Sequence, residues 1–149
     1  MGNISGNNTW TGNQTFNADV NGLGQGEHVK EDLGISAGAN VTSIDTTYRA
    51  VGIYYLDRNG NHRLRFNIAI ASTASSSTTH TYIIDGVTFK NVATYFQPCD
   101  YRENSGIAGD CNTVPNTGGI QINRASATSG ANLGLSGDVE LESKPTWAP

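Results

Sequence analysis

Three carboxylates near the C-terminus have a spacing that could support chemistry. Asp138, Glu140 and Glu142 alternate with Val139 and Leu141, so an extended strand would place the acids on one face and the apolar side chains on the other. Pairs of carboxylates about 5–9 Å apart catalyse glycoside hydrolysis. Acids on a strand face can also be merely solvated, and a cation, or Arg and Lys from a neighbour, could relieve their repulsion. We favour this second interpretation, and we do not expect the protein to be an enzyme.

The two cysteines, Cys99 and Cys111, bracket the segment CDYRENSGIAGDC. A disulfide between them would contribute about 3 kcal/mol by restricting the unfolded chain, and it would stiffen a loop without a regular pattern. Two free thiols are the alternative. A zinc site needs four ligands, but the histidines, His28, His62 and His80, are scattered. We therefore expect a candidate disulfide, no bound metal and no other cofactor.

Side chains that could contact a partner occur at two further places. Arg63 and Arg65 alternate with Leu64 and Phe66, which predicts two basic side chains on the outer face of a half-buried strand. They could bind an acidic shell surface or an anionic glycan; a solvated face, or one salt-bridged to another subunit, is the interpretation that we favour. Trp147 lies in the terminal KPTWAP. We expect it to pack on the folded domain or on a neighbouring subunit.

The segment NTWTGNQTFNADV, residues 8–20, alternates strictly between polar and less polar residues, with Trp10, Phe16 and Val20 on one side. Ordering it as a strand costs about 1–2 kcal/mol per residue, and burying Trp10 and Phe16 returns about 3 kcal/mol each. It therefore needs neighbouring strands, either from its own domain or from other chains. The glycine-rich joint GLGQG favours an arm that reaches outward. We predict an N-terminal arm over 1–24 and a knob over 25–149.

Composition favours an all-β knob. Gly, Asn, Thr and Ser make up 62 of 149 residues, and charged residues only 15%; Thr suits strands, and the other three suit turns. The only candidate helix is 26–34, where a polar turn is the alternative. We expect strands over 47–56, 62–72, 81–89, 91–98, 119–124, 132–136 and 137–143, hairpin turns at Asn59-Gly60 and Asp85-Gly86, and loops over 73–79, 99–118 and between 124 and 132. Such an element order predicts a β-sandwich, jelly-roll-like in topology.

Charge and hydropathy argue against two classes of partner. The net charge is −4, which gives no electrostatic reason for nucleic-acid binding. The chain contains no apolar run approaching the roughly 18 residues of a membrane span. We therefore expect neither a nucleic-acid nor a membrane partner.

Two short segments resemble bacteriophage proteins. TWTGNQTFNADV is similar to the repeats of fibre and tailspike proteins, where W/F-x-G-x-Q-T-F segments occur in trimeric stalks. SGDVELESKPTWAP resembles the last strand of phage fibre tip domains. Together they cover about 25 residues. This resemblance implies a homotrimeric protein on the virion surface, assembled in the host cytoplasm, where its cysteines would be reduced.

The length departs from that family, because fibres and tailspikes usually have several hundred residues. A short chain that starts at Met1 better matches a capsid decoration (cement) protein or a short head fibre, with an arm on the major capsid protein or another virion protein. We expect this structural role, with Trp10, Phe16 and Val20 making the contact. The alternative is the receptor-binding tip of a longer tail fibre that recognises host surface glycans.

Overall fold

The computed structural model describes residues 26–149 except 46–48, 93–95 and 104–108, and it describes only the backbone of residues 76 and 125–131. Every regular element in these ranges is a β-strand, and none is a helix that could cross a membrane. The strands are β1 (His28–Lys30), β2 (Ile35–Ala37), β3 (Val41–Asp45), β4 (Ala50–Leu56), β5 (His62–Ile84), β6 (Asp100–Glu103), β7 (Gly109–Thr113) and β8 (Gly119–Glu140).

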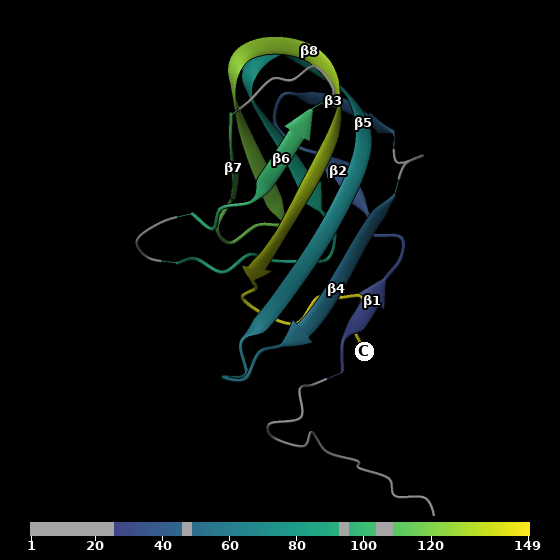
Figure 1. The fold of residues 1–149 in the computed structure, drawn as a ribbon, viewed down its shortest axis with the longest axis vertical. Helices are drawn as coiled ribbons and strands as arrows, with labels where there is room; N and C mark the ends of the chain where they lie inside the picture. Colours follow the sequence, from purple (N-terminus) through teal and green to yellow (C-terminus); the bar gives the residue numbers. More distant parts are fainter. Residues whose placement is uncertain (1–25, 46–48, 93–95, 104–108) are drawn as a thin grey trace, which may run out of the picture.

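Two long strands, β5 and β8, organise the fold because each passes through both sheets. Residues 63–73 of β5 pair antiparallel with 130–140 of β8, and 79–83 pair with 119–123. Between these blocks the register shifts twice. Such irregularities bend a strand and increase its twist, and the paired ribbons curve over at the top of Figure 1.

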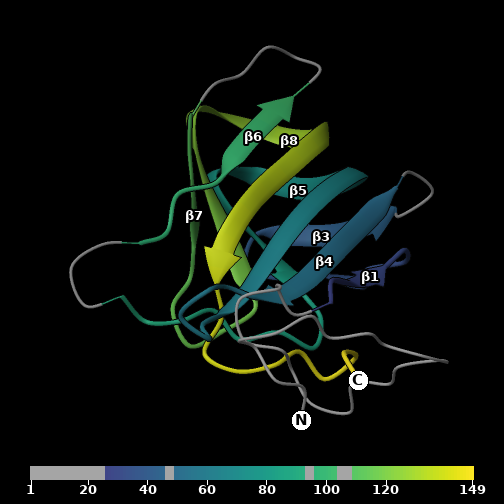
Figure 2. The same ribbon diagram turned by 60° about the horizontal axis from the view of Figure 1, so that its bottom comes forward.

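The halves of these strands belong to two antiparallel sheets. The front sheet has the order β1-β4-β5-β8-β6. In the back sheet, β2 pairs with the C-terminal end of β5 (82–84), and β7 pairs with the N-terminal part of β8 (120–124). β3 pairs with β5 beside the bend, and Figure 2 shows the curved strands of the front sheet side by side. The expectation of an all-β protein is confirmed.

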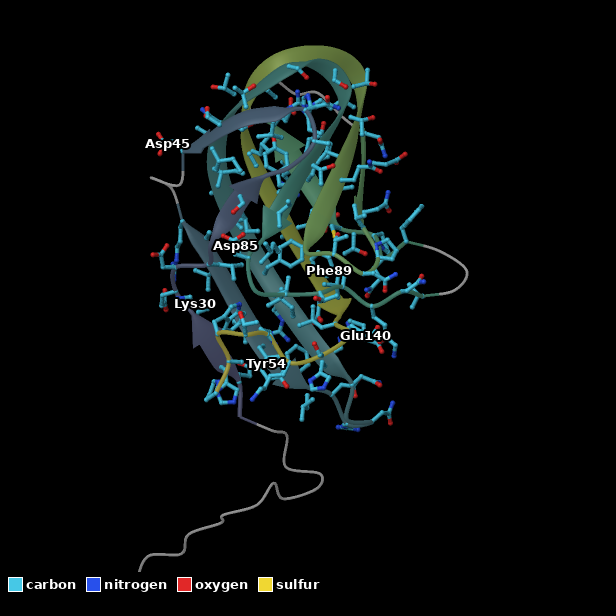
Figure 3. The ribbon with its side chains drawn as sticks, turned by 180° about the vertical axis from the view of Figure 1, so that it is seen from behind. Lys30, Asp45, Tyr54, Asp85, Phe89 and Glu140 are labelled. Carbon is cyan, nitrogen blue, oxygen red and sulfur yellow. The ribbon has the colours of Figure 1, made fainter. Side chains whose placement is uncertain are left out.

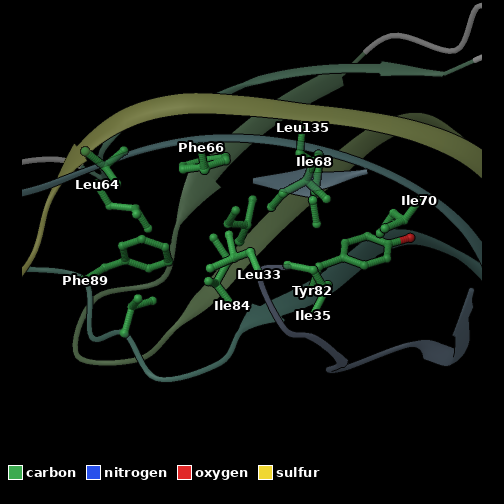
Figure 4. Packing of buried hydrophobic residues seen from close by; sticks show 14 of the residues in the cluster. Leu33, Ile35, Leu64, Phe66, Ile68, Ile70, Tyr82, Ile84, Phe89 and Leu135 are labelled. Atoms are coloured by element: carbon green, nitrogen blue, oxygen red, sulfur yellow. The ribbon is translucent and has the colours of Figure 1, made fainter. Parts of the chain in front are cut away.

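The core lies between the inner faces of the two sheets, as the close view in Figure 4 shows. Alternate residues of β5 and β8 point inward, as the period of a strand requires, and each such side chain contributes roughly 1.5–3 kcal/mol when fully buried. The inward hydrophobic residues of β5 and β8 that are 2% exposed or less are Leu64, Phe66, Ile68, Ile70, Tyr82, Ile84, Ile120, Ile122, Leu135 and Val139.

The hairpin expected at Asn59-Gly60 is confirmed. β4 pairs antiparallel with β5, from Leu56 opposite His62 to Ala50 opposite Ile68. Gly60 has the positive φ of 81° that completes the turn. The side chain of Asp57 accepts hydrogen bonds from the backbone N–H of Asn59 at 2.8 Å and of Asn61 at 2.9 Å. These bonds hold the turn from which β5 starts.

The helix expected over 26–34 is wrong. His28–Lys30 forms β1 instead and pairs with Gly52–Tyr54 of β4. Val29 is 54% exposed and Leu33 only 1%, so the two do not share a buried helical face. An isolated helix of two turns is marginal in water, whereas the edge of β4 offers unpaired backbone groups.

The loops expected over 73–79 and between 124 and 132 are also wrong. Their Ser, Thr, Ala and Gly content suggests turns. In the structure the two segments pair with each other as antiparallel strands, with Ser77 opposite Thr128. Mutual pairing keeps both in strand conformation, so 132–136 and most of 137–143 belong to one strand. The loop expected over 99–118 contains β6 and β7, which pair with β8.

Two expected strands are shorter than the pattern suggested. Gly86 has φ of 75° and forms the expected turn, but the return segment makes only an isolated bridge, between Phe89 and Leu141. Among the described residues of 91–98, only Pro98 bridges, to Asn112. The arm over 1–24 lies outside the described residues.

Candidate binding face

The outer face of the front sheet brings together polar side chains from four strands. The register places Ile53 of β4, Arg65 of β5 and Asp138 of β8 in one row across the sheet. The next row contains Val51, Asn67, Ser136 and, from β6, Asp100. Alternation sends these residues outward because Leu64 and Phe66 point into the core.

Asp138 is the centre of a charged network on this face. The Tyr55 hydroxyl donates to the Asp138 carboxylate, with its oxygen atoms 2.7 and 2.9 Å away. Arg63 donates through Nη2 at 3.0 Å and through Nε at 3.2 Å. Arg65 Nε lies 3.6 Å from the same carboxylate, and Arg65 also lies 3.6 Å from Glu27. The basic strip expected from Arg63 and Arg65 is therefore neutralised by carboxylates of the same chain.

Tyr55 is held as a hydrogen-bond donor by its surroundings. Burial raises the pKa of its hydroxyl, and the hydrogen bond to Asp138 raises it further, while Arg63 opposes the shift. The guanidinium of Arg65 covers the Tyr55 ring, 5.4 Å from its centroid. The aromatic face is thus occupied by a cation of the same chain, and this limits it as a stacking platform.

A shallow hollow of about 450 Å³ lies over the middle of the face. Its size suits a small or extended polar ligand. A second hollow of about 370 Å³ adjoins it, over Arg49, Val51, Asn67 and Ala69. We call the first hollow the front-face groove; it is lined by Val51, Ile53, Arg65, Phe66, Asn67, Asp100, Ser136, Gly137 and Asp138.

The groove offers one apolar wall and several polar groups of different kinds. Carboxylates accept hydrogen bonds, guanidinium groups donate them, and the amide of Asn67 and the hydroxyl of Ser136 can do both. Two of its lining residues, Ser136 and Gly137, have small or no side chains. This arrangement can bind a polyhydroxylated molecule.

The other two acids of the C-terminal trio do not join Asp138 in a catalytic arrangement. Glu140 contacts the ammonium group of Lys90, and Glu142 is exposed beyond the end of β8. Lys90 has a raised pKa because it donates to Glu140. The expected relief of repulsion by Arg and Lys is confirmed for Asp138 and Glu140. Figure 3 shows Glu140 at the lower end of the molecule, below Phe89.

A fully buried ion pair lies where β6 ends. Arg124 of β8 pairs with Glu103 of β6, and both side chains are 0% exposed. His80 of β5 is also fully buried, with Nε2 3.1 Å from the Ser75 carbonyl. Burial lowers the pKa of His80, and the nearby positive charge of Arg124 lowers it as well, while the hydrogen bond to Ser75 opposes this. Since this cluster is closed to solvent, we assign it to holding β6 against the bent strands.

The histidines are less scattered than the sequence suggested. The rings of His28 and His62 both stack on the ring of Tyr54, and the ring centroids are 5.9 Å apart in each pair. The Tyr54 hydroxyl lies 2.8 Å from His62 Nδ1. Across the part of the chain that the structure describes, however, no three His, Cys, Asp or Glu side chains gather as a metal site.

The remaining predicted site residues fall in three places. Trp147 packs against the core of its own chain, beside the Gly86 turn. Cys99 and Cys111 are free thiols on neighbouring segments. Trp10, Phe16 and Val20 lie outside the described residues.

Sequence reasoning missed most of the groove. Four of its residues belong to no sequence motif, and only the alternation along each strand indicates that they point outward: Ile53, Asn67, Asp100 and Ser136. Alternation shows which residues point outward, but it does not show which strands are neighbours.

Comparisons with known proteins add no relative to this picture. No protein-family model, curated protein or solved structure matches the chain.

Proposed function

We propose that this protein is a non-enzymatic structural component of a bacteriophage particle surface. In this proposal it is a trimeric capsid decoration (cement) protein or short head fibre that attaches through the arm over 1–24. The knob is then a β-sandwich of jelly-roll type that projects from the particle.

The observation that carries the proposal is the alternating segment 8–20. Its apolar side, with Trp10, Phe16 and Val20, needs a covering surface, and its sequence resembles the stalk repeats of phage fibres. The body supports this division, because the described chain reaches its first strand, β1, at the edge of the front sheet. In the proposal, the segment that precedes this edge strand contacts the partner.

The test combines location with a change in the arm. Immunogold labelling of phage particles with an antibody to the knob should mark the head evenly. Trp10→Ser with Phe16→Ser should abolish attachment to particles assembled without this protein, while thermal unfolding of the knob stays unchanged. The matched control is Thr11→Ser with Thr15→Ser on the polar side, which should attach normally. Attachment by the Trp10 and Phe16 variant, or particles without any gold, would contradict the proposal.

The front-face groove favours a second candidate, a receptor-binding tip that recognises host surface glycans. Sugars present alternating hydroxyl and C–H surfaces, and the groove offers carboxylate, guanidinium and amide groups beside Val51 and Ile53. A glycan array probed with the labelled chain tests this role. Binding should disappear in Asn67→Ala and persist in Thr42→Ala, a change at an exposed residue of β3. Gold confined to the tail end of the particle would favour this candidate over the first.

A further inference from the structure

The two cysteines lie directly opposite each other on neighbouring antiparallel segments. The backbone N–H of Cys99 donates to the Cys111 carbonyl at 2.8 Å, and that of Thr113 donates to the Gln97 carbonyl at 2.9 Å. Between them, Pro98 bridges Asn112. This register puts 97–99 against 111–113, with Cys99 facing Cys111.

Such a pairing satisfies the requirements of a disulfide. Opposite residues of an antiparallel pair have Cα atoms about 4.5–5.5 Å apart, which is within the span of about 4.4–6.8 Å that a disulfide bridges. Their side chains also project to the same side of the pair. The Cys99 thiol interacts with Cys111 and is the largest cause of the raised pKa of Cys111, followed by burial.

We propose that Cys99 and Cys111 form a redox pair that closes to an intrachain disulfide and clamps the segment before β6 to β7. The clamp encloses β6, which is the edge of the front sheet and carries Asp100 of the front-face groove. It therefore ties one wall of the groove to the back sheet. This inference does not depend on the proposed function.

The oxidant that we infer is a small-molecule disulfide such as oxidised glutathione. Cys99 is half-buried and Cys111 is buried, so the Cys99 thiolate attacks first and one glutathione leaves as a thiolate. Cys111 then loses its proton to water and attacks the Cys99 sulfur, which releases the second glutathione. Two protein thiols are oxidised by two electrons, and one oxidised glutathione is reduced to two thiols. The second step is the slow one, because the thiolate of Cys111 is disfavoured by burial.

The experiment uses the full chain incubated with oxidised glutathione, followed by alkylation and peptide mapping by mass spectrometry without reduction. We expect one peptide pair joined through Cys99 and Cys111, with the loss of two hydrogen masses. The midpoint of thermal unfolding should rise by about 10 °C over that of the reduced chain. Dithiothreitol should reverse both changes.

Two single variants separate the roles of the thiols. Cys111→Ser should retain one glutathione at Cys99, whereas Cys99→Ser should react far more slowly. Full alkylation of both cysteines after incubation, or a disulfide between two chains, would overturn the proposal. So would an oxidised chain whose unfolding midpoint equals that of the reduced one.

Discussion

Single side chains in this protein are held by partners that lie far away along the chain. Asp138 bonds to Tyr55 across 83 positions, and Gln97 bonds to the backbone of Glu140 across 43. The first bond connects β4 to β8, and the second connects the segment before β6 to the end of β8, so the loss of either affects more than a local turn. Two buried polar residues, His80 and Gln97, allow measurable predictions at this scale.

His80 should make stability depend on pH. Its pKa is lowered from 6.5 in the folded protein, first by burial. The unfolded chain therefore binds the proton more readily, and the stability that the neutral ring contributes is present above pH 6.5 and is lost as pH falls below it. Arg124, Glu103 and the Ser75 carbonyl are the groups that act on the ring.

We expect His80→Gln to flatten this loss of stability. Urea unfolding from pH 7 to pH 5 should show a decline for the wild type of up to about 1.4 kcal/mol per pH unit from this residue, and a shallower decline for the variant. Thr42→Ala, a change at an exposed residue that does not titrate, serves as the control and should keep the wild-type slope. Equal slopes for wild type and His80→Gln would show that this ring is not responsible.

Gln97 completes the edge of β8 with two hydrogen bonds. Its amide nitrogen donates to the Glu140 carbonyl at 2.8 Å, and its amide oxygen accepts from the Glu140 N–H at 2.6 Å. Gln97→Ala leaves the Glu140 N–H unpaired and removes one of two donors from the Glu140 carbonyl, which keeps its bond from the Lys90 N–H at 3.1 Å. The change should therefore lower the free energy of unfolding by about 1–3 kcal/mol. Chemical denaturation measures this, with the half-buried Gln121→Ala as a control expected to cost less. A loss no larger than that of the control would mean that water replaces the amide.

At the scale of elements, the sequence predicts which side chains of a strand point inward better than it predicts which strands pair with each other. Alternation correctly placed Leu64 and Phe66 inside and Arg63 and Arg65 outside, and Asn59-Gly60 correctly marked a hairpin. Alternation could not show that 73–79 and the stretch after 124 remain strands. These segments, rich in small residues, are kept in strand conformation by pairing with each other. The groove was missed for the same reason: its residues meet only through the pairing of β5 with β4 and β8, and of β8 with β6.

Two glycines around β8 should respond oppositely to the same change. A methyl group at Gly118, just before β8, would lie 2.4 Å from the Ile84 carbonyl oxygen, whereas one at Gly134 would meet nothing within 4 Å. Gly118→Ala therefore forces the β5–β8 contact apart and should destabilise the protein by about 1–3 kcal/mol. Gly134→Ala should be neutral or slightly stabilising, because it restricts the unfolded chain. Thermal unfolding compares the two, and similar losses at both sites would contradict this account of the space around the two glycines.

At the scale of the whole molecule, the two sheets enclose one core. Ala148 belongs to this core, and Trp147 packs against it. The last residues of the chain thus belong to the body, and Thr146 donates its N–H to the Gly86 carbonyl at 2.8 Å. In our proposal, the apolar side chains that contact another surface belong to the segment over 1–24, and trimerisation and attachment both depend on that segment.

Deleting residues 1–24 tests this division directly. The full chain should sediment as a trimer of about 47 kDa, three times the 15.8 kDa of one chain, since its Trp10 and Phe16 would be covered only by neighbouring copies. The shortened chain should sediment as a monomer, with an unchanged unfolding midpoint because the core residues of the described chain lie between Leu33 and Ala148. Light scattering after gel filtration gives an independent mass. If the shortened chain remains a trimer, the subunit contacts lie on the two-sheet body, and the exposed edge strands β1 and β6 become the places to look for them.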